Sequence, residues 1–588
     1  MFLASITPWS LTTSLFTILG SLGVFLYGMK VMSEGIQKVA GEKMRSALSK
    51  MTANRLSGVF TGFFITSVIQ SSSATTVLVV SFVHAGLLTL VEAIGVIMGA
   101  NLGTTITAWI VAATAKFQVS TIALPLIGIG LPCLFLGKDK GKSWGETLIG
   151  FGLLLFGLGL LKDSVPDVRT LMKEDPEVAK QIEGIMRGFG GHGFGSVLLF
   201  LFGGLVLTLL VQSSSAAMAI TVTCALSGWL GDIQADPLLV FRNSAAIVLG
   251  ENIGTTVTAW LAALPANTAA KRAARAHFLF NVIGVCWMLV VFLPFTQMVW
   301  KMAGYLPESL RAADKAFQKS EIAFATAIFH SAFNFTNICI LIWFVPQFAK
   351  LVERLVKEKA GEQTKPHLSY LSGNIVGLGE LNLAEAEAAT NRMAGLASEM
   401  FNGFTEVVEK PGEDLSVMVA GLKKMEETCD SLLQDTTAYL IQCSAHEIGA
   451  GNAERVTKLL RAVSEYEEAT DRIYRLVKTV QRKYKQGQDF TEGQHRDLRA
   501  IAMEVRASLD LAANSLSAAD AGLLETAHAV EDRVDALRKR QNAEAARRMQ
   551  AGGNVQAEML YIDMNNHLEA VANHTLNIVQ TMAQAVKA

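Results

Sequence analysis

The sequence predicts an all-α protein in which a polytopic helical membrane domain precedes a soluble helical domain. Apolar residues are concentrated in residues 1–350, and the stretch 57–115 carries a single formal charge, on Glu92. Residues 351–588 are instead rich in Ala, Glu, Lys and Arg, with apolar positions at helical spacing. Because ~20 apolar residues cross the hydrocarbon core of a bilayer, the first part is long enough to cross it repeatedly. The net charge of −1 gives no indication of nucleic-acid binding.

Nine apolar stretches are candidate membrane segments in contact with lipid. Several of them carry Gly, Ser or Asn near their centres, so we expect some to be broken helices or re-entrant hairpins. The first stretch has no basic region or A-x-A site before it, so it is expected to be a retained helix and not a cleaved signal. The stretches run near residues 11–33, 57–83, 86–113, 118–136, 147–161, 195–225, 238–263, 276–300 and 322–347.

Two polar motifs occur twice within these apolar stretches. Residues 70–76 read QSSSATT and residues 212–218 read QSSSAAM. Residues 99–109 read GANLGTTITAW and residues 250–260 read GENIGTTVTAW. Duplicated segments broken by glycine and polar residues are the sequence pattern of a secondary transporter's binding site, where the repeats are usually inverted.

The duplication extends upstream of each QSSS motif. Gly62 and Thr66 precede the first motif by the same spacings at which Gly204 and Thr208 precede the second. The predicted organisation is a membrane domain at 1–350, with repeats at about 11–136 and 147–300 and a last span at about 322–347, then a linker at 351–384 and a helical domain at 385–588.

The motifs have the chemistry of a site for an anion and cations. A helix that begins in the middle of a membrane presents free N–H groups and the positive end of its dipole, which bind phosphate-like anions. Hydroxyl, amide and carbonyl oxygens suit a hard cation such as Na⁺. The candidate binding residues are Gln70, Ser71, Ser72, Ser73, Thr75, Asn101, Thr104, Thr105, Gln212, Ser213, Ser214, Ser215, Glu251, Asn252, Thr255 and Thr256.

Each of these interpretations has an alternative. Ser, Thr and Gly also line helix contacts in membranes because they are small, but two matched pairs of motifs favour binding. Glu251, whose counterpart is Ala100, is either a functional carboxylate or a loop residue. His277 and His330 each precede an asparagine by four residues, a spacing for which we favour hydrogen bonding between helices over a substrate role.

The C-terminal part also contains related segments. MEETCDSL at 425–432 parallels VEDRVDAL at 530–537, and EEATDRIY at 467–474 parallels EAVANHTL at 569–576. The spacing of apolar positions predicts two bundles of about three helices each. Glu467 and Asp471 lie one helical turn apart, so they form either a divalent-metal site or an exposed acidic face.

Basic residues predict the orientation. The segment that follows the last span carries Lys350, Arg354 and Lys357, and the loop near 137–146 carries three lysines. Both are therefore expected to be cytoplasmic, which puts the C-terminal domain inside the cell and the first domain in the inner (cytoplasmic) membrane.

With these motifs, residues 10–350 resemble the bacterial form of the type II sodium-dependent phosphate cotransporter family, and the chain from 365 onward resembles the helical phosphate-regulatory domain known as PhoU. The resemblance implies a sodium-coupled phosphate symporter that works by alternating access, with no enzymatic activity. It also implies that Gln70–Ser73 and Gln212–Ser215 line the phosphate and sodium sites, and that the tail has a metal-binding regulatory role. The first half lacks the H-x-x-x-N that follows the second GTT at 277–281.

Other functions stay open at this point. The chain could be a membrane-anchored phosphate sensor with little transport, or a transporter of another oxyanion. The tail could bind a second copy of the chain or a phosphate-signalling protein. A serine hydrolase is disfavoured, because the serines of the QSSS motifs do not lie in a G-x-S-x-G motif.

Overall fold

The chain is helical throughout the part that its computed structural model describes, which confirms the all-α prediction. No strand occurs among these residues. They are 8–49, 54–84, 88–116, 119–174, 193–264, 266–304, 316–357, 379–409, 416–444, 450–517 and 521–583, with the single positions 177, 180 and 184.

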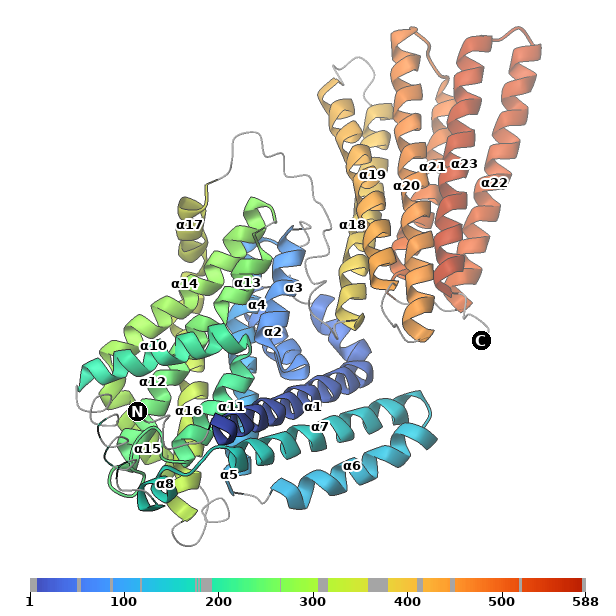
Figure 1. The fold of residues 1–588 in the computed structure, drawn as a ribbon. Helices are drawn as coiled ribbons and strands as arrows, with labels where there is room; N and C mark the ends of the chain where they lie inside the picture. Colours follow the sequence, from blue (N-terminus) through green and yellow to red (C-terminus); the bar gives the residue numbers. More distant parts are fainter. Residues whose placement is uncertain are drawn as a thin grey trace. The chain divides into compact units, whose positions relative to one another are not determined.

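The chain divides into two compact units, one reaching to about residue 362 and one that contains Gly379–Ala588. The described helices of the first unit are α1 (Pro8–Ser49), α2 (Arg55–Ile69), α3 (Ser72–His84), α4 (Leu90–Gly103), α5 (Thr105–Lys116), α6 (Val119–Leu136), α7 (Asp139–Ser164), α8 (Val168–Glu174), α10 (Phe194–Val211), α11 (Ser214–Leu226), α12 (Pro237–Gly254), α13 (Thr256–Ala262), α14 (Thr268–Val290), α15 (Phe292–Gly304), α16 (Ala316–Leu341) and α17 (Val345–Leu355), with a short 3₁₀ turn at Ile342–Phe344 (Figure 1).

Six of the described helical stretches are long and apolar enough to cross a membrane. They are Thr12–Ala40, Leu90–Ala115, Lys140–Ser164, Phe194–Val211, Thr268–Val290 and Ser320–Leu355. Two of the predicted membrane segments, 57–83 and 195–225, are each divided into two shorter helices. At 1.5 Å per residue, the 15 residues of α2 extend about 22 Å, less than the ~30 Å of a hydrocarbon core. The expectation of broken helices therefore holds at both QSSS motifs.

Glycines allow α2 and α4 to pack with their backbones in contact. A Cβ added at Gly62 would lie 2.0 Å from the Val96 carbonyl oxygen, and one added at Gly99 would lie 1.9 Å from the Val59 carbonyl oxygen. Both distances are far below van der Waals contact. Small residues of this kind drive helix association in membranes, where lipid removes the hydrophobic driving force.

The second copy has the same arrangement between α10 and α12. A Cβ at Gly204 would lie 2.1 Å from the Ile247 oxygen, and one at Gly250 would lie 1.9 Å from the Leu201 oxygen. Gly99 and Gly250 are the first glycines of the two G-x-N-x-G motifs. The contact therefore holds each G-x-N-x-G helix against the helix that leads into the QSSS motif of the same copy.

The described part of the second unit consists of six long helices, α18 (Gly379–Glu409), α19 (Ser416–Ser444), α20 (Ala450–Lys485), α21 (Glu492–Ser515), α22 (Ala521–Gln550) and α23 (Val555–Ala583). Contacts define one group of α18–α20 and another of α21–α23, which meet where α20 packs on α23 and α18 packs on α21. Buried side chains such as Phe401, Tyr466 and Tyr561 form a continuous core across both groups. Helices α17 and α18 both extend into the predicted linker, whose residues 358–378 lie outside the described part of the chain.

Glu385 is a fully buried carboxyl group in the second unit. It accepts a hydrogen bond of 2.7 Å from the Tyr439 hydroxyl across the contact between α18 and α19. Burial raises the pKa of Glu385 from 4.5 to about 8, and the tyrosine hydrogen bond only partly offsets this shift. The carboxyl group is therefore mostly protonated at neutral pH.

This raised pKa predicts a pH-dependent stability. The unfolded chain loses the proton near pH 4.5 and the folded chain near pH 8, so stability falls as pH rises through this window, by about 1.4 kcal/mol per pH unit. Glu385→Gln should remove this dependence and stabilise the unit at pH 7 by on the order of 3 kcal/mol. Urea unfolding of residues 379–588 at pH 5–8 measures it. Glu399→Gln, an exposed change on the same helix, is the control, and parallel pH profiles for both variants would contradict the assignment.

Candidate functional site

The two QSSS motifs share an unusual backbone conformation. Gln70 and Gln212 have φ values of 57° and 54°, and among the described residues they are the only non-glycine residues with positive φ. Each donates its backbone N–H to the threonine carbonyl four residues earlier, Thr66 or Thr208, and ends its helix. Non-glycine residues in this region carry a cost that clusters at functional sites. In both copies, therefore, one helix ends at the glutamine of the motif and the next helix begins two residues after it.

The serines that follow begin new helices. Ser71 Oγ accepts the N–H of Ala74 at 3.2 Å, and Ser213 Oγ accepts the N–H of Ala216 at 3.3 Å. The first N–H groups of a helix have no carbonyl partner inside it, so each motif presents unpaired donors at the positive end of a 13-residue helix, α3 or α11.

The G-x-N-x-G-T-T motifs each lie at a second, milder break. α4 ends at Gly103 and α5 begins at Thr105, while α12 ends at Gly254 and α13 begins at Thr256. The hydroxyls of Thr105 and Thr256 donate at 2.7 Å to carbonyls three residues earlier, at the end of the preceding helix. These two threonines therefore satisfy the backbone at the break.

The two copies of both motifs meet at one cavity. Its volume is about 10 Å³, room for about one water molecule or one small cation. Residues from both copies form its wall: Ser72, Asn101 and Thr104 from the first, and Ser214, Glu251, Asn252 and Thr255 from the second, with His330 from α16.

Glu251 places a carboxylate at this cavity. Its side chain is 2 % exposed, and Oε1 accepts a hydrogen bond of 2.7 Å from the hydroxyl of Thr221 on α11. It forms no ion pair with any residue that the structure describes. A buried carboxyl group without a basic partner takes up either a proton or a cation, so Glu251 fits a cation site.

Asn101 is held by the H-x-x-x-N pair of α14. Its Oδ1 lies 3.2 Å from Nε2 of His277, and its Nδ2 donates to Oδ1 of Asn281 at 3.4 Å. The H-x-x-x-N that follows the second GTT motif in sequence thus contacts the first copy of the G-x-N-x-G motif. This pair does make the helix–helix hydrogen bonds predicted for it, and it makes them to a candidate binding residue.

The second H-x-x-x-N pair, on α16, occupies the matching place at the other copy. Nδ2 of Asn334 donates to Oδ1 of Asn252 at 3.5 Å, and His330 lines the cavity itself. His330 is 5 % exposed, and its Nδ1 has no hydrogen-bond partner among the described residues. His330, for which the sequence favoured hydrogen bonding between helices over a substrate role, therefore lines the candidate site. Its signal in the sequence was the repetition of H-x-x-x-N at 277 and 330.

The glutamines and remaining serines lie around this cavity without lining it. Ser215 donates to Thr107 at 3.4 Å, and Thr107 donates to Oε1 of Gln70 at 2.9 Å, so a hydrogen-bonded chain joins the second copy to the first. Gln212 is exposed. Thr75 donates its hydroxyl to the Ser71 carbonyl. Three further candidates, Ser71, Ser73 and Ser213, are also absent from the cavity wall.

The candidate metal residues of the tail face other carboxylates. Glu467 on α20 shares a hydrogen bond with Asp430 on α19, and Asp471 lies nearby. Burial, followed by the charges of Asp430, Glu468 and Asp471, raises the pKa of Glu467 to about 7. Asp471 also pairs with Arg475 at 2.8 Å. Within the described ranges, no group of three or more His, Cys, Asp or Glu side chains is arranged to hold a metal ion.

A set of apolar helices around a buried cavity of hydroxyls, amides and one carboxylate defines a multi-pass membrane transport protein. The chain belongs to the Na⁺/Pi-cotransporter family, whose model matches residues 24–163 and 178–304. Its family is one of transporters and not of enzymes.

Three relatives show how far the similarity extends. YqeW of Bacillus subtilis (strain 168), an uncharacterised protein, is 31% identical over 265 residues, which cover 45% of this chain and 78% of the relative. YjbB of Escherichia coli (strain K12), a candidate inorganic phosphate export protein, is 25% identical over 466 residues, 79% of this chain and 77% of the relative. The human sodium-dependent phosphate transport protein 2B is 41% identical over 100 residues, 17% of this chain and 14% of the relative. No solved structure matches significantly.

Proposed function

We propose that the chain is a sodium-coupled phosphate symporter whose two motif copies form one shared site. The observation that carries this proposal is the cavity, because residues 142 or more positions apart, such as Ser72 and Ser214, line the same space. Family membership supports phosphate as the substrate and sodium as the coupling ion.

The site chemistry suits an anion and cations together. The N-termini of α3 and α11 supply N–H groups and positive dipole ends for phosphate. Glu251 and the oxygens of Asn101, Asn252, Thr104 and Thr255 are ligands of the kind that Na⁺ takes. Opposite charges bound side by side lower the cost of dehydrating each of them.

Transport requires this cavity to enlarge. Phosphate does not fit a space of about 10 Å³, so we infer that the helices of the two copies move apart to admit it. Two helix pairs with the same glycine contact, α2–α4 and α10–α12, are the rigid parts that such a movement would displace. Their similarity supports alternating access between two repeats, which we expect to be inverted.

The proposal is tested by phosphate movement into proteoliposomes that contain the purified protein. Labelled phosphate should accumulate under an inward Na⁺ gradient and not under a K⁺ gradient, with little competition from sulfate. Equal competition by sulfate would instead favour a general oxyanion transporter, and saturable phosphate binding without flux would favour a sensor.

Export is a second candidate function. It is favoured by the Escherichia coli relative, which matches this chain over 77% of its own length and is a candidate phosphate export protein. Loading the same vesicles with phosphate and reversing the Na⁺ gradient compares the two directions. If outward phosphate flux is faster than inward flux at gradients of equal size, the chain is assigned to export.

We propose further that the second unit is a PhoU-like regulatory domain on the cytoplasmic side of the inner membrane. The basic residues beside the last span support that orientation. Its two groups of three helices, with a carboxylate cluster between α19 and α20, support a divalent-metal role for Glu467 and Asp471, to which Glu426 and Asp430 lie close.

The metal role predicts a stabilising effect of divalent cations. Mn²⁺ should raise the thermal midpoint of residues 379–588, because a cation relieves repulsion between these carboxylates. Replacing both Glu467 and Asp471 with alanine should abolish the increase. The matched control replaces Glu569 and Asn573, which hydrogen-bond each other at the corresponding positions of α23. An equal Mn²⁺ response in both double variants would show that the cation acts elsewhere.

A further inference from the structure

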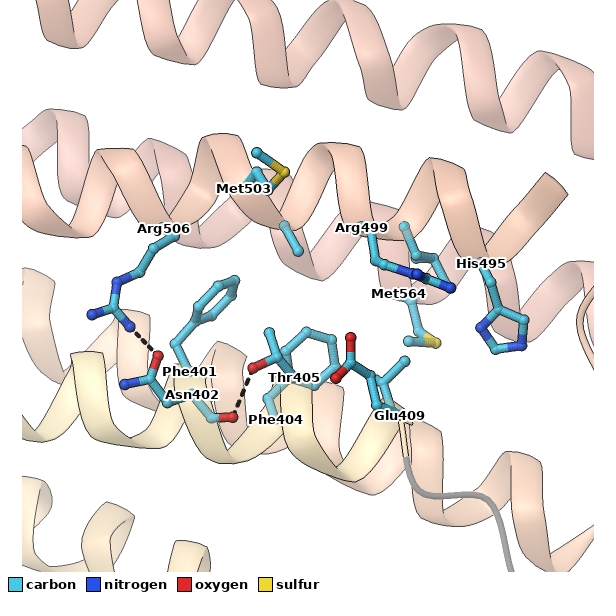
Figure 2. A pocket seen from close by; sticks show the side chains of 13 residues that line it. Phe401, Asn402, Phe404, Thr405, Glu409, His495, Arg499, Met503, Arg506 and Met564 are labelled. Carbon is cyan, nitrogen blue, oxygen red and sulfur yellow. Dashed lines mark hydrogen bonds between the residues drawn. The ribbon is translucent and has the colours of Figure 1, made fainter. Parts of the chain in front are cut away.

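The cavities of the two units differ in what surrounds them. In the second unit, a cavity of about 730 Å³ lies between α18 and α21 (Figure 2). Its phenylalanines, Phe401 and Phe404, are buried in the core, and Arg506 already donates a hydrogen bond to Asn402. The cavity between the two motif copies of the first unit, here called the transport cavity, is far smaller. Hydrogen bonds fix the orientation of the polar side chains around it, so these side chains specify the kind of ligand that fits.

The threonine hydroxyls that line the transport cavity have no hydrogen to offer to a ligand. Thr104 donates its hydroxyl hydrogen to the Ala100 carbonyl at 3.2 Å, and Thr255 donates to the Glu251 carbonyl at 2.8 Å. A hydroxyl has one hydrogen and two lone pairs. Both oxygens are therefore left with lone pairs alone, which suit a cation and not the oxygen atoms of phosphate.

Asn101 in the wall of this cavity has its amide orientation fixed by α14. The Asn281 nitrogen donates at 3.0 Å to the His277 carbonyl, so the Asn281 oxygen is the atom that faces Asn101. Asn101 therefore turns its nitrogen to Asn281, at 3.4 Å, and its oxygen to Nε2 of His277, at 3.2 Å. Because a carbonyl oxygen only accepts, Nε2 carries the hydrogen. The Asn101 oxygen keeps one further lone pair.

Asn252 is fixed by its own helix and by α16. Its nitrogen donates to the Val248 carbonyl at 2.8 Å, and its oxygen accepts from the Asn334 nitrogen at 3.5 Å. The Asn334 nitrogen also donates at 3.0 Å to the carbonyl four residues earlier in α16. In both H-x-x-x-N pairs, therefore, the helix backbone orients the asparagine of the pair, and this asparagine orients an asparagine of the transport cavity.

Helices α14 and α16 are also held by the tryptophans that end the two longer motifs. Trp109 of the first copy donates its indole N–H to Ser331 of α16 at 2.9 Å. Trp260 of the second copy packs against Phe278 of α14, with ring centroids 5.6 Å apart. Each helix thus contacts the asparagine of one copy and the tryptophan of the other. This crossed arrangement fixes the position of both helices relative to both copies.

We propose that His277 and Asn281 on α14, and Asn334 on α16, are positioning residues for sodium. All three are fully buried, and none of them lines the transport cavity. They hold the amides of Asn101 and Asn252 so that a carbonyl oxygen of each is available to the cation. Groups that orient the ligands of a cation raise its affinity, because the ligands need not reorganise when it binds. This inference rests on the proposed sodium coupling.

The test is sodium binding to the purified full-length chain in detergent, without phosphate. Sodium should raise the melting temperature of the parent, and the rise with concentration gives an apparent Kd. Choline, which is too large for a cavity of about 10 Å³, replaces sodium to keep the ionic strength constant. Asn281→Ala and Asn334→Ala should each raise the sodium Kd by about tenfold.

His277 allows a matched pair of variants at one position. The nitrogen of a glutamine side chain lies as many bonds from Cα as Nε2 of histidine, whereas the nitrogen of asparagine matches Nδ1. His277→Gln should therefore keep the sodium Kd close to the parental value, and His277→Asn should raise it by about tenfold. Equal sodium Kd values in these two variants would overturn the role of the Nε2 contact.

Asn337→Ala is the control for the loss of a buried asparagine. Asn337 is also fully buried and joins α14 to α16, because it accepts from Trp287 at 3.0 Å and donates to the Phe280 carbonyl at 3.4 Å. Neither partner lines the transport cavity. This variant should lower the melting temperature without sodium and leave the sodium Kd unchanged. Equal increases in Kd for the Asn281 and Asn337 variants would show an effect of stability alone and contradict the proposal.

The remaining outcomes also decide the proposal. The α14 variants act on one copy and Asn334→Ala on the other, so if one variant does not fold, the other copy still gives the answer. A parent that sodium does not stabilise would overturn the proposal. Phosphate uptake into proteoliposomes separates it from the transport proposal. Sodium binding without phosphate flux would refute symport alone, whereas sodium-driven uptake with the same sodium dependence in every variant would refute the positioning role alone.

Discussion

Gly204→Ala should destabilise the membrane unit by about 2–3 kcal/mol, whereas Gly203→Ala should leave its stability almost unchanged. The added Cβ at Gly204 would lie 2.1 Å from a backbone oxygen of α12, and a backbone atom cannot rotate away as a flexible side chain can. The helices must separate to accept it. Gly203 is its neighbour in the same helix, and a Cβ there has nothing within 4 Å.

Thermal stability is measured on the detergent-solubilised chain, as the fraction of the protein that remains monodisperse after heating. Gly62→Ala should match Gly204→Ala, because its Cβ would lie 2.0 Å from a carbonyl oxygen of α4. Equal stability of the Gly203 and Gly204 variants would show that the helices are not in backbone contact.

Glu251→Gln should reduce sodium-driven phosphate uptake by at least about tenfold while the protein inserts and folds normally. Glutamine keeps the shape of the side chain and can still accept the hydrogen bond from Thr221. What it loses is the negative charge at the cavity, and a contact to a charged group is worth roughly 1.5–3 kcal/mol. The loss should be greatest at low sodium.

The control for this variant is Glu92→Gln. Glu92 lies in the first turn of α4, where it closes a capping box with Thr89, and glutamine serves in the same box. It does not line the cavity, so uptake should be unchanged. Sodium activation that is the same in the Glu251 variant as in the parent would remove Glu251 from the cation site.

Local backbone features of the transport site could be predicted from the sequence because the duplication made them visible. The paired QSSS motifs indicated helix breaks, and the breaks fall at Gln70 and Gln212. The shared spacing of Gly62 and Gly204 from these motifs indicated a common role, which the structure shows to be backbone contact between helices.

Tertiary pairing could not be predicted from the same patterns. Nothing in the spacing of His277 and Asn281 shows that they contact Asn101, 176 and 180 positions earlier. Nor does local sequence tell which threonine lines the cavity, as Thr104 does, and which does not, as at Thr105.

The most direct test of the shared site is sodium-driven phosphate uptake by Ser72→Ala, Ser214→Ala and the double variant, with Ser67→Ala as control. Ser72 and Ser214 line the cavity from opposite copies, while Ser67 donates to a carbonyl of its own helix. One shared site predicts that each single variant loses most of its uptake and that the double variant loses little more. Half of the uptake surviving in each single variant, and none in the double, would show two independent sites and contradict the account.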